Sequence, residues 1–426
     1  MHLICRPRGE SVKVLFLNTF DIAGGAGRGA YRHHKGLQNL GVESRMLVQN
    51  KNTHDDSIMC SGKGPLHRLR ARLRNFDLLP LLLYPTRRWT PWSTGWLKNG
   101  IARRVARENA DLIHLHWVCH GFVPISAVAQ FKQPVVWQLA DPWAFTGGCH
   151  YPQGCTRYRE SCGFCPQLGS KRENDLSRWT WKQKKTHWKA VNLTIVTQSR
   201  WMRDLAKESS LFSKSRVETI PAGLDENTFA PLDKIEARTR ENLPLDKKII
   251  LVGAIHGTRD PRKGFHDLVQ ALKLLAGEGW NERAILLVFG GKPPAHPPDI
   301  PLQTVYAGYV PDDRLIRFYS AADVFVAPSR EEAFGQTALE SLASGTPCVG
   351  FDVGGLRDTI LHQRTGYLAQ PYSATDLATG IAWILGDDDR RKALSENARK
   401  RVLTEFTMAS VARRYLNLYE DVLGRL

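Results

Sequence analysis

The sequence lacks a hydrophobic run long enough to cross a membrane. A transmembrane helix needs about 20 consecutive apolar residues, whereas the longest apolar stretch, LLPLLLY at 78–84, is short and contains a proline. The first ten residues, MHLICRPRGE, have no apolar segment of the kind that a secretory signal requires. Together these absences predict a cytoplasmic protein.

The sequence also lacks a recognisable nucleic-acid-binding motif, although it is strongly basic. It has 59 Lys and Arg against 42 Asp and Glu, which gives a formal net charge of +17. No zinc finger, helix-turn-helix or RNP pattern is present, so we do not expect nucleic acid as a partner. The charge favours an anionic lipid surface or a phosphorylated small molecule.

Much of this charge lies in residues 63–108, which hold eleven Lys and Arg and two acidic residues. Within this range Leu66, Leu69, Leu73 and Phe76 fall on one face of a predicted helix, with arginines on both sides. The pattern suits a helix that lies on an anionic bilayer, peripheral to the membrane. The alternative is a solvated basic face behind a leucine stripe that packs on the core.

Two series of apolar strands alternate with helical patterns. Such runs are typical of buried parallel strands covered by helices on both faces. We therefore expect an α/β protein with two doubly wound Rossmann-like domains facing a cleft and C-terminal helices, and ligands at the carboxyl ends of the strands. The predicted strands are 12–20, 43–49, 111–117, 134–140, 192–199 and 216–223 in the first series, and 247–254, 284–291, 304–310, 323–329 and 346–351 in the second.

The most specific pattern is APSREEAFGQTALESLASGTPCVG at 327–350. Glu332 lies in a loop after a predicted strand, and Glu340 lies in the second turn of the helix that follows. Carboxylates suit vicinal hydroxyls, because their oxygens accept hydrogen bonds from adjacent OH groups. Between the two, a helix N-terminus presents backbone N–H groups that suit a phosphate. This backbone belongs to Phe334, Gly335 and Gln336.

A second phosphate-directed element is GAIHGTRDPRKGFHDL at 253–268, a basic loop that enters a helix. Lys263 precedes a glycine, where the backbone can pass close to a ligand. For a second cation we favour Arg259, with Arg262 as the alternative.

The first strand is followed by DIAGGAGRG at 21–29, which does not fit the dinucleotide-binding pattern. Gly24 and Gly25 are candidates for a close ligand approach, although turn geometry alone would also explain them. Further along, we expect His114 and His116 on opposite faces of their strand, so that one of them reaches the ligand edge.

The stretch EAFGQTALE followed by SGTPCVG resembles the EX7E signature of retaining GT-B glycosyltransferases of family 4. The resemblance runs from DIAGGAGRGAYRHHKGL to RTGYLAQ at 364–370. It implies that Glu332 contacts the donor sugar, Glu340 holds the ribose diol, Lys263 neutralises the diphosphate and His116 touches the donor sugar. The backbone at 334–336 would hold the sugar and the diphosphate.

The same resemblance implies four parts of the chain. These are an N-terminal extension at 1–10, an acceptor-side domain at 11–223, a nucleotide-sugar donor domain at 224–404 and a C-terminal helix at 405–426 that packs back on the first domain. Gly24 and Gly25 would then admit the donor diphosphate and the acceptor. No catalytic metal is expected, because Lys263 and helix N–H groups would balance the charge.

The chain departs from the family pattern at two positions. Ala254 stands where an arginine is usual, and Ala140 stands where a histidine usually precedes Asp141. Asp141 stays an acceptor-side candidate, although a turn or capping role would also explain it. The second departure leaves a noncatalytic membrane-associated assembly protein as an alternative, and a GT-B nucleotide-sugar epimerase is another.

Four cysteines, Cys149, Cys155, Cys162 and Cys165, follow the spacing C-x5-C-x6-C-x2-C. A structural zinc ion is the favoured interpretation, with reduced packing cysteines or disulfides as alternatives. The surrounding stretch resembles an exopolysaccharide and colanic-acid-type subgroup of bacterial glycosyltransferases. We expect a hexosyltransferase that extends a lipid-linked glycan in cell-surface polysaccharide biosynthesis. The further acceptor-side candidates are Gly147, Gly148 and His150.

Overall fold

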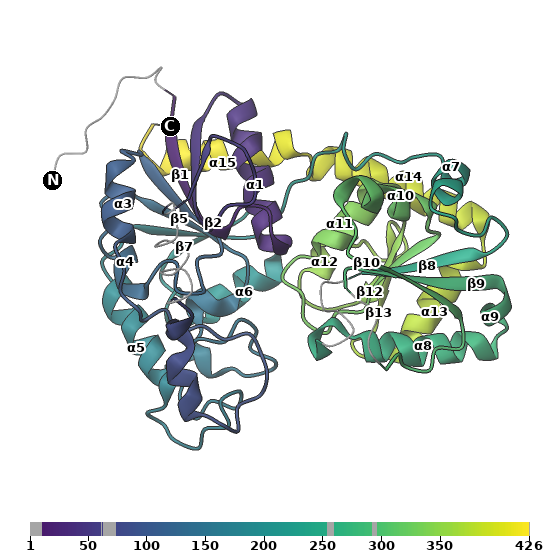
Figure 1. Cartoon of the computed structure of the whole chain (residues 1–426), viewed down its shortest axis with the longest axis horizontal. Coiled ribbons are helices and arrows are strands. Elements are labelled where there is room, and N and C mark those ends of the chain that lie inside the picture. The colour runs from purple at the N-terminus through teal and green to yellow at the C-terminus, as the bar shows by residue number, and fades with distance from the viewer. Residues whose placement is uncertain (1–10, 61, 63–73, 254–259, 292–295, 426) are drawn as a thin grey trace. The chain divides into compact units, whose positions relative to one another are not determined.

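A computed structural model of the chain describes residues 11–60, 62, 74–253, 260–291 and 296–425 (Figure 1). The chain divides into two compact units. One contains the chain up to Gly223 together with Ala409–Leu426, and the other is Leu224–Met408. The predicted extension at 1–10 lies outside the described residues.

The N-terminal unit is built on a seven-stranded parallel sheet with the order β3-β2-β1-β4-β5-β6-β7. Its strands are β1 (Lys13–Phe20), β2 (Glu43–Asn50), β3 (Ile58–Cys60), β4 (Leu112–Leu115), β5 (Val135–Leu139), β6 (Leu193–Thr197) and β7 (Arg216–Thr219). Its helices are α1 (Gly24–Asn39), α3 (Ile101–Arg107), α4 (Ile125–Val128), α5 (Leu176–Trp188) and α6 (Arg200–Glu208), with short 3-10 helices η1 (Arg74–Leu83), η2 (Pro142–Phe145) and η3 (Arg157–Arg159).

A helix from the far end of the sequence completes the core of this unit. Helix α15 (Met408–Val422) runs beside the sheet of this unit (Figure 1). Its Tyr415 and Tyr419 are buried in the same core as residues of β1, β2 and β4. The Tyr415 hydroxyl donates to Gln138 Oε1 at 2.8 Å, and the Tyr419 hydroxyl lies 2.7 Å from His114 Nδ1. Strands β4 and β5 therefore share their core with the last helix.

The second unit is built on a six-stranded parallel sheet with the order β10-β9-β8-β11-β12-β13. Its strands are β8 (Lys248–Gly253), β9 (Ala284–Phe289), β10 (Gln303–Gly308), β11 (Val324–Ala327), β12 (Cys348–Phe351) and β13 (Gly366–Ala369). Its helices are α7 (Lys234–Arg240), η4 (Pro261–Lys263), α8 (Phe265–Gly277), α9 (Trp280–Arg283), α10 (Asp312–Ala321), α11 (Gln336–Ala343), α12 (Leu356–Thr359), α13 (Ala374–Leu385) and α14 (Asp388–Glu405). The two parallel sheets confirm the predicted α/β class with two Rossmann-like units.

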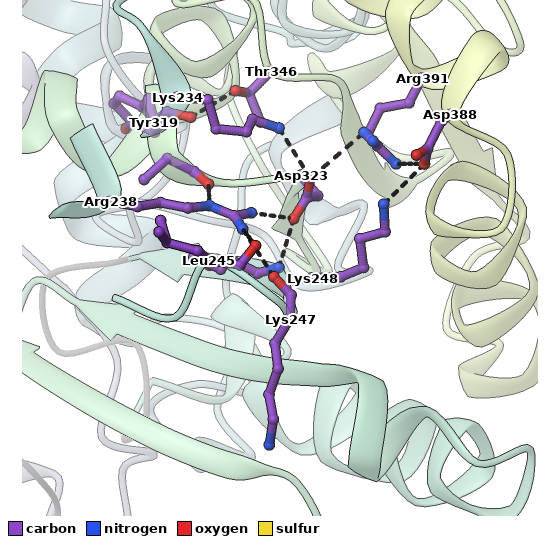
Figure 2. Close-up of polar contacts among 12 residues, drawn as sticks. Lys234, Arg238, Leu245, Lys247, Lys248, Tyr319, Asp323, Thr346, Asp388 and Arg391 are labelled. Carbon is purple, nitrogen blue, oxygen red and sulfur yellow. Dashed lines mark hydrogen bonds and ion pairs between the residues drawn. The ribbon is translucent and has the colours of Figure 1, made fainter. Parts of the chain in front are cut away.

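A buried carboxylate ties several elements of the second unit together at the amino end of β11 (Figure 2). Asp323 is 2% exposed and accepts hydrogen bonds from Arg238 Nη2 at 2.6 Å, Lys234 Nζ at 2.9 Å and Ile249 N at 2.7 Å. Arg391 Nε of α14 lies 3.5 Å from it. One carboxylate therefore joins α7, β8 and α14 to the sheet.

Helix η1 covers part of the predicted membrane-binding segment. No helix among the residues described here is long and apolar enough to span a bilayer. Leu66, Leu69 and Leu73 lie outside the described residues, but Phe76 is 46% exposed. The alternative in which this stripe packs on the core therefore does not hold for Phe76.

Candidate active site

The two predicted catalytic residues of the second unit meet although they are 69 positions apart. Glu332 lies in the loop between β11 and α11, and Lys263 ends η4. Lys263 Nζ donates to Glu332 Oε2 at 2.7 Å, and Ser329 Oγ donates to the same oxygen at 3.3 Å. The Glu332 and Lys263 side chains are 16% and 22% exposed. The pair is therefore shielded from bulk water but still open to a ligand.

The electrostatic setting keeps Glu332 ionised. Burial alone would raise the pKa of this carboxyl, but the positive charges of Lys263 and Arg262 outweigh burial and hold its pKa below the ordinary value. At neutral pH Glu332 is therefore an acceptor of hydrogen bonds and a negative charge, not a proton donor.

A glycine fixes Lys263 against the loop that carries Glu332. Gly264 has a φ of 64°, and a Cβ placed there would lie 1.8 Å from the carbonyl oxygen of Pro328. The Arg330 amide also donates to the Arg262 carbonyl at 2.8 Å. Only glycine permits this close approach, so the contact between the two loops is built into the backbone.

The start of α11 forms the backbone part of the site. Gly335 has a left-handed conformation with φ 92°, directly before Gln336 begins the helix. Phe334 is 1% exposed, and its ring packs in the core against Phe406. Only the main chain of Phe334 is therefore available to a ligand. The first N–H groups of a helix lack intrahelical partners and suit an anion.

Glu340 lies one turn further along α11 and is 3% exposed. The Tyr319 hydroxyl of α10 donates to Glu340 Oε2 at 3.1 Å. Tyr319 was not identified from the sequence, since nothing in its local pattern distinguishes it from a core tyrosine. It fixes one oxygen of the carboxylate that the sequence predicts to bind the ribose.

The second cation of the site is only partly described. Arg259 lies outside the described residues. Arg262 donates to Asp260 Oδ2 at 2.9 Å and to the carbonyl of Glu331 at 3.3 Å, so its guanidinium braces the loop.

In the N-terminal unit, Gly24 and Gly25 open helix α1. Gly24 has a φ of 69°, and a Cβ placed there would meet no atom within 4 Å. The conformation, rather than crowding, requires glycine at this position, and the space beside it is open. These observations fit both a close ligand approach at this turn and a turn that needs glycine for its geometry alone.

The prediction that His114 and His116 lie on opposite faces is wrong. Residues two apart along a strand share a face, and the two rings are 5.0 Å apart. Burial lowers the pKa of His116 to about 3, so its imidazole is neutral. His116 is 3% exposed and lies in the core, so its contact with a donor sugar remains a prediction.

Asp141 has a histidine partner, but not at the position where the family pattern places one. His150 Nδ1 lies 2.7 Å from Asp141 Oδ2, and Trp117 Nε1 donates to the same oxygen at 2.8 Å. Although burial would raise the pKa of Asp141, His150 and the hydrogen bonds hold it below the ordinary value. Asp141 therefore has an imidazole partner nine residues further along, although Ala140 precedes it.

This pair continues to Ser93, whose hydroxyl lies 3.0 Å from His150 Nε2. The order Ser–His–Asp has the connectivity of a hydrolase triad. However, Ser93 is 1% exposed and His150 is 3% exposed, so no substrate carbonyl reaches the hydroxyl. The chain of hydrogen bonds therefore supports the loop and does not supply a nucleophile.

The glycines before His150 have a packing role. A Cβ at Gly147 would lie 2.5 Å from the Ser177 carbonyl oxygen, and one at Gly148 would lie 2.3 Å from the Trp92 ring. Beneath this loop Lys184 is fully buried and donates to the Trp143 and Thr146 carbonyls. Contact of these glycines with an acceptor remains a prediction.

The four clustered cysteines line one cavity of about 20 Å³. None of the cysteines that the structure describes forms a disulfide. Burial raises the pKa of Cys162 to about 12. The turn between Cys162 and Cys165 has a left-handed conformation at three consecutive residues, including Phe164, and the Cys165 amide donates to Asp175 Oδ2 at 2.8 Å. The thiols therefore converge on a tightly held loop.

Comparisons with known proteins show which families the two units resemble. Residues 23–228 match the model of Glycosyltransferase Family 4, and residues 233–401 match that of Glycosyl transferases group 1. A D-inositol 3-phosphate glycosyltransferase of Thermobispora bispora is 33% identical over 226 residues, which are 50% of this chain and 52% of the relative. The chain thus spans about half the length of the curated relatives that it matches.

Solved structures support the fold over nearly the whole chain. A sucrose-phosphate synthase of Thermosynechococcus elongatus aligns with a TM-score of 0.71 at 22% identity, covering 97% of this chain and all of that chain. HepE of Anabaena, in complex with UDP-glucose, aligns with a TM-score of 0.61 at 16% identity, covering 96% of this chain and 99% of that chain. At these identities the likeness shows the fold alone.

Proposed function

We propose that the chain transfers a sugar from a nucleotide diphosphate to an acceptor hydroxyl with retention of configuration. The support is that residues 23–228 match the model of Glycosyltransferase Family 4 and residues 233–401 that of Glycosyl transferases group 1. The observation that carries this proposal is the contact between Lys263 and Glu332 beside the first turn of α11. This site brings together a cation that suits a diphosphate, a carboxylate that suits sugar hydroxyls, and backbone N–H groups that suit a phosphate.

Each part of the donor has a matching group. The ribose diol binds Glu340, whose second carboxylate oxygen is positioned by Tyr319. The diphosphate binds Lys263 and the N–H groups at the start of α11. Glu332 accepts hydrogen bonds from the sugar hydroxyls.

In the transfer step, the bond between the anomeric carbon and the phosphate oxygen breaks, and the acceptor oxygen bonds to the same face of that carbon. The acceptor proton passes to the departing phosphate oxygen. Negative charge grows on the leaving diphosphate, where Lys263 stabilises it most strongly in the transition state. Because UDP-glucose occupies the structural neighbour HepE, uridine donors are the first to test.

The change Glu340→Ala tests this assignment. We expect donor turnover to be abolished and the thermal shift produced by UDP-glucose to disappear. Glu396→Ala is the matched control, because it removes an exposed glutamate of the same unit. Full activity of Glu340→Ala would contradict the proposed donor site.

Two alternatives predict different products from the same assay. A nucleotide-sugar epimerase would release an isomeric free sugar or sugar nucleotide from the donor alone, without an acceptor. A noncatalytic assembly protein would bind the donor but transfer nothing across a panel of acceptors. A glycosidic product that needs both substrates excludes both alternatives.

We further propose that the acceptor is a lipid-linked glycan of cell-surface polysaccharide biosynthesis, reached at an anionic membrane surface. The support is an apolar surface formed by η1 and the turn after it. Leu82, Leu83 and Trp89 are 75%, 80% and 94% exposed, and Arg87 and Arg88 lie between them in sequence. Apolar side chains beside arginines suit the interface of an anionic bilayer.

Vesicle sedimentation tests the membrane surface. We expect the triple change Leu82→Ser, Leu83→Ser and Trp89→Ser to weaken binding to phosphatidylglycerol vesicles by at least about tenfold, because each buried side chain contributes roughly 1.5–3 kcal/mol. Leu403→Ser, 48% exposed in the other unit, is the control. Equal binding of the triple variant and the control would contradict the proposal.

We also propose that the four cysteines hold a structural zinc ion that braces this surface. Leu81 of η1 and Trp92 pack against Cys165 and Leu168 in one small core, so the cysteine loop and the apolar surface form one packed region. Zinc analysis of the purified protein tests the site. A folded, active enzyme whose cysteines bind no metal would contradict it.

A further inference from the structure

Three histidines of the N-terminal unit meet inside its core. His33 comes from α1, His114 from β4 and His116 from the residue after that strand. One ring nitrogen of each lies within 4.8 Å of the other two. Their exposed fractions are 3%, 0% and 3%. Three imidazoles from two separate elements therefore converge where water has little access.

Each ring has a nitrogen without a partner among the described residues. These atoms are His33 Nδ1, His114 Nε2 and His116 Nε2. A buried polar atom left without a hydrogen bond costs about 1–3 kcal/mol, and such atoms are rare in folded proteins. Because the three rings lie together, one species bound among them would satisfy these nitrogens at once.

The opposite nitrogens of two rings are already held by one hydroxyl. Tyr419 Oη lies 2.7 Å from His114 Nδ1 and 3.5 Å from His33 Nε2. A histidine that binds a metal almost always uses its other nitrogen for a hydrogen bond that orients the ring. His33 and His114 show this arrangement, and the nitrogens they leave over are the ones without partners.

The surroundings of the three rings are apolar. All three histidines are buried, and the Phe16 ring stacks on His114 with centroids 4.5 Å apart. An apolar site favours the neutral ring over imidazolium, and neutral imidazole is the form that binds metals.

We propose that His33 Nδ1, His114 Nε2 and His116 Nε2 bind a divalent transition metal of the zinc class, which fastens α1 to β4. Zinc lies 2.0–2.1 Å from imidazole nitrogens in a tetrahedral arrangement, so small ring rotations must bring the three nitrogens to about 3.4 Å from one another.

Because all three ligands are almost fully buried, the ion has a structural role and contacts no substrate. On this proposal His116 holds the metal instead of touching the donor sugar, and the donor site at Glu332, Lys263 and Glu340 and the cysteine site are unaffected.

Metal analysis of matched variants tests the proposal. His33→Gln keeps a polar side chain but removes one ligand, and we expect it to lose one equivalent of metal per chain. His34→Gln is the control, because His34 is also buried but has partners on both nitrogens, Ser44 Oγ at 2.7 Å and Ser57 Oγ at 2.8 Å. Equal metal content in the two variants would overturn the proposal.

The cysteine site must be separated from this one. In a Cys162→Ser and Cys165→Ser variant, one equivalent of metal should remain. Loaded with cobalt, that variant should show ligand-field bands without the intense thiolate-to-cobalt charge-transfer band. If His33→Gln does not fold, X-ray absorption of the zinc-loaded cysteine variant decides, because imidazole scattering must appear. No bound metal, or no imidazole scattering, would overturn the proposal.

Discussion

The buried carboxylate at the amino end of β11 allows a stability prediction with a worked magnitude. In Asp323→Ala, the Arg238 guanidinium, 6% exposed, loses its carboxylate, and the Ile249 amide loses its acceptor. Removing one partner of a buried ion pair typically costs about 3–5 kcal/mol, because it leaves an uncompensated charge. We expect the second unit to lose about 4 kcal/mol of unfolding free energy.

An exposed carboxylate of the same network is the control (Figure 2). Asp388 accepts hydrogen bonds from Lys248 at 2.8 Å and Arg391 at 2.7 Å, but it is 71% exposed. Exposed ion pairs contribute about 0–1 kcal/mol, so Asp388→Ala should cost no more than about 1 kcal/mol.

Native-state hydrogen exchange in urea is the appropriate assay, because a single melting temperature would not separate the unfolding of the two units. The amides of β8 and β11 should lose protection in Asp323→Ala, while those of β1 and β4 should not. The lysine and arginine charges outweigh burial and hold the pKa of Asp323 below its ordinary 3.8. Its contribution is therefore present above about pH 4 and is lost as the pH falls through the folded pKa. Equal costs of Asp323→Ala and Asp388→Ala would refute this reasoning.

Three further predictions follow from the site and its supports. Gly264→Ala places a methyl group 1.8 Å from the Pro328 carbonyl oxygen. The resulting strain of about 1–3 kcal/mol should displace Lys263 from Glu332 and lower kcat/KM at least about tenfold. Gly277→Ala is the control, because a methyl group there meets no atom within 4 Å, and it should leave kcat/KM unchanged. Tyr319→Phe should weaken nucleotide binding about fivefold to tenfold in calorimetry, since Glu340 loses a hydrogen bond of about 1 kcal/mol; unchanged affinity would contradict this role. Burial lowers the pKa of Lys184 to about 7 from 10.5, so between these values the unfolded chain binds more protons than the folded one. The unfolding free energy of the wild type, relative to Lys184→Met, should therefore rise from pH 7 to 9 by up to about 1.4 kcal/mol per pH unit. Parallel pH profiles of unfolding for the two proteins would contradict this.

The architecture could be predicted from the sequence because each buried parallel strand is a short apolar run between helical patterns. Two strands were not predicted. Strand β3 has three residues, and β13, GYLA, begins with a glycine. Both lie at sheet edges, where burial on two faces no longer enforces a long apolar run.

The site could be predicted only where its residues share a local motif. The segment with Glu332 and Glu340 is a single loop and helix, so their spacing carries the information. Tyr319, in contrast, reaches Glu340 from another helix, and His150 reaches Asp141 around a loop. Such contacts depend on how elements pack, and no spacing in the sequence encodes them.

The last helix of the N-terminal unit also sets an order of events during synthesis. Helix α15 comes after the whole second unit in the sequence, yet Tyr415 and Tyr419 close the core of the first. While the chain grows, the second unit can complete its own core, whereas the first must wait for residues 408–422. Domains usually fold from the N-terminus onward as they emerge from the ribosome. Here the sheet that is synthesised first completes its core last, and the sheet face that carries His114 stays uncovered until α15 has been made.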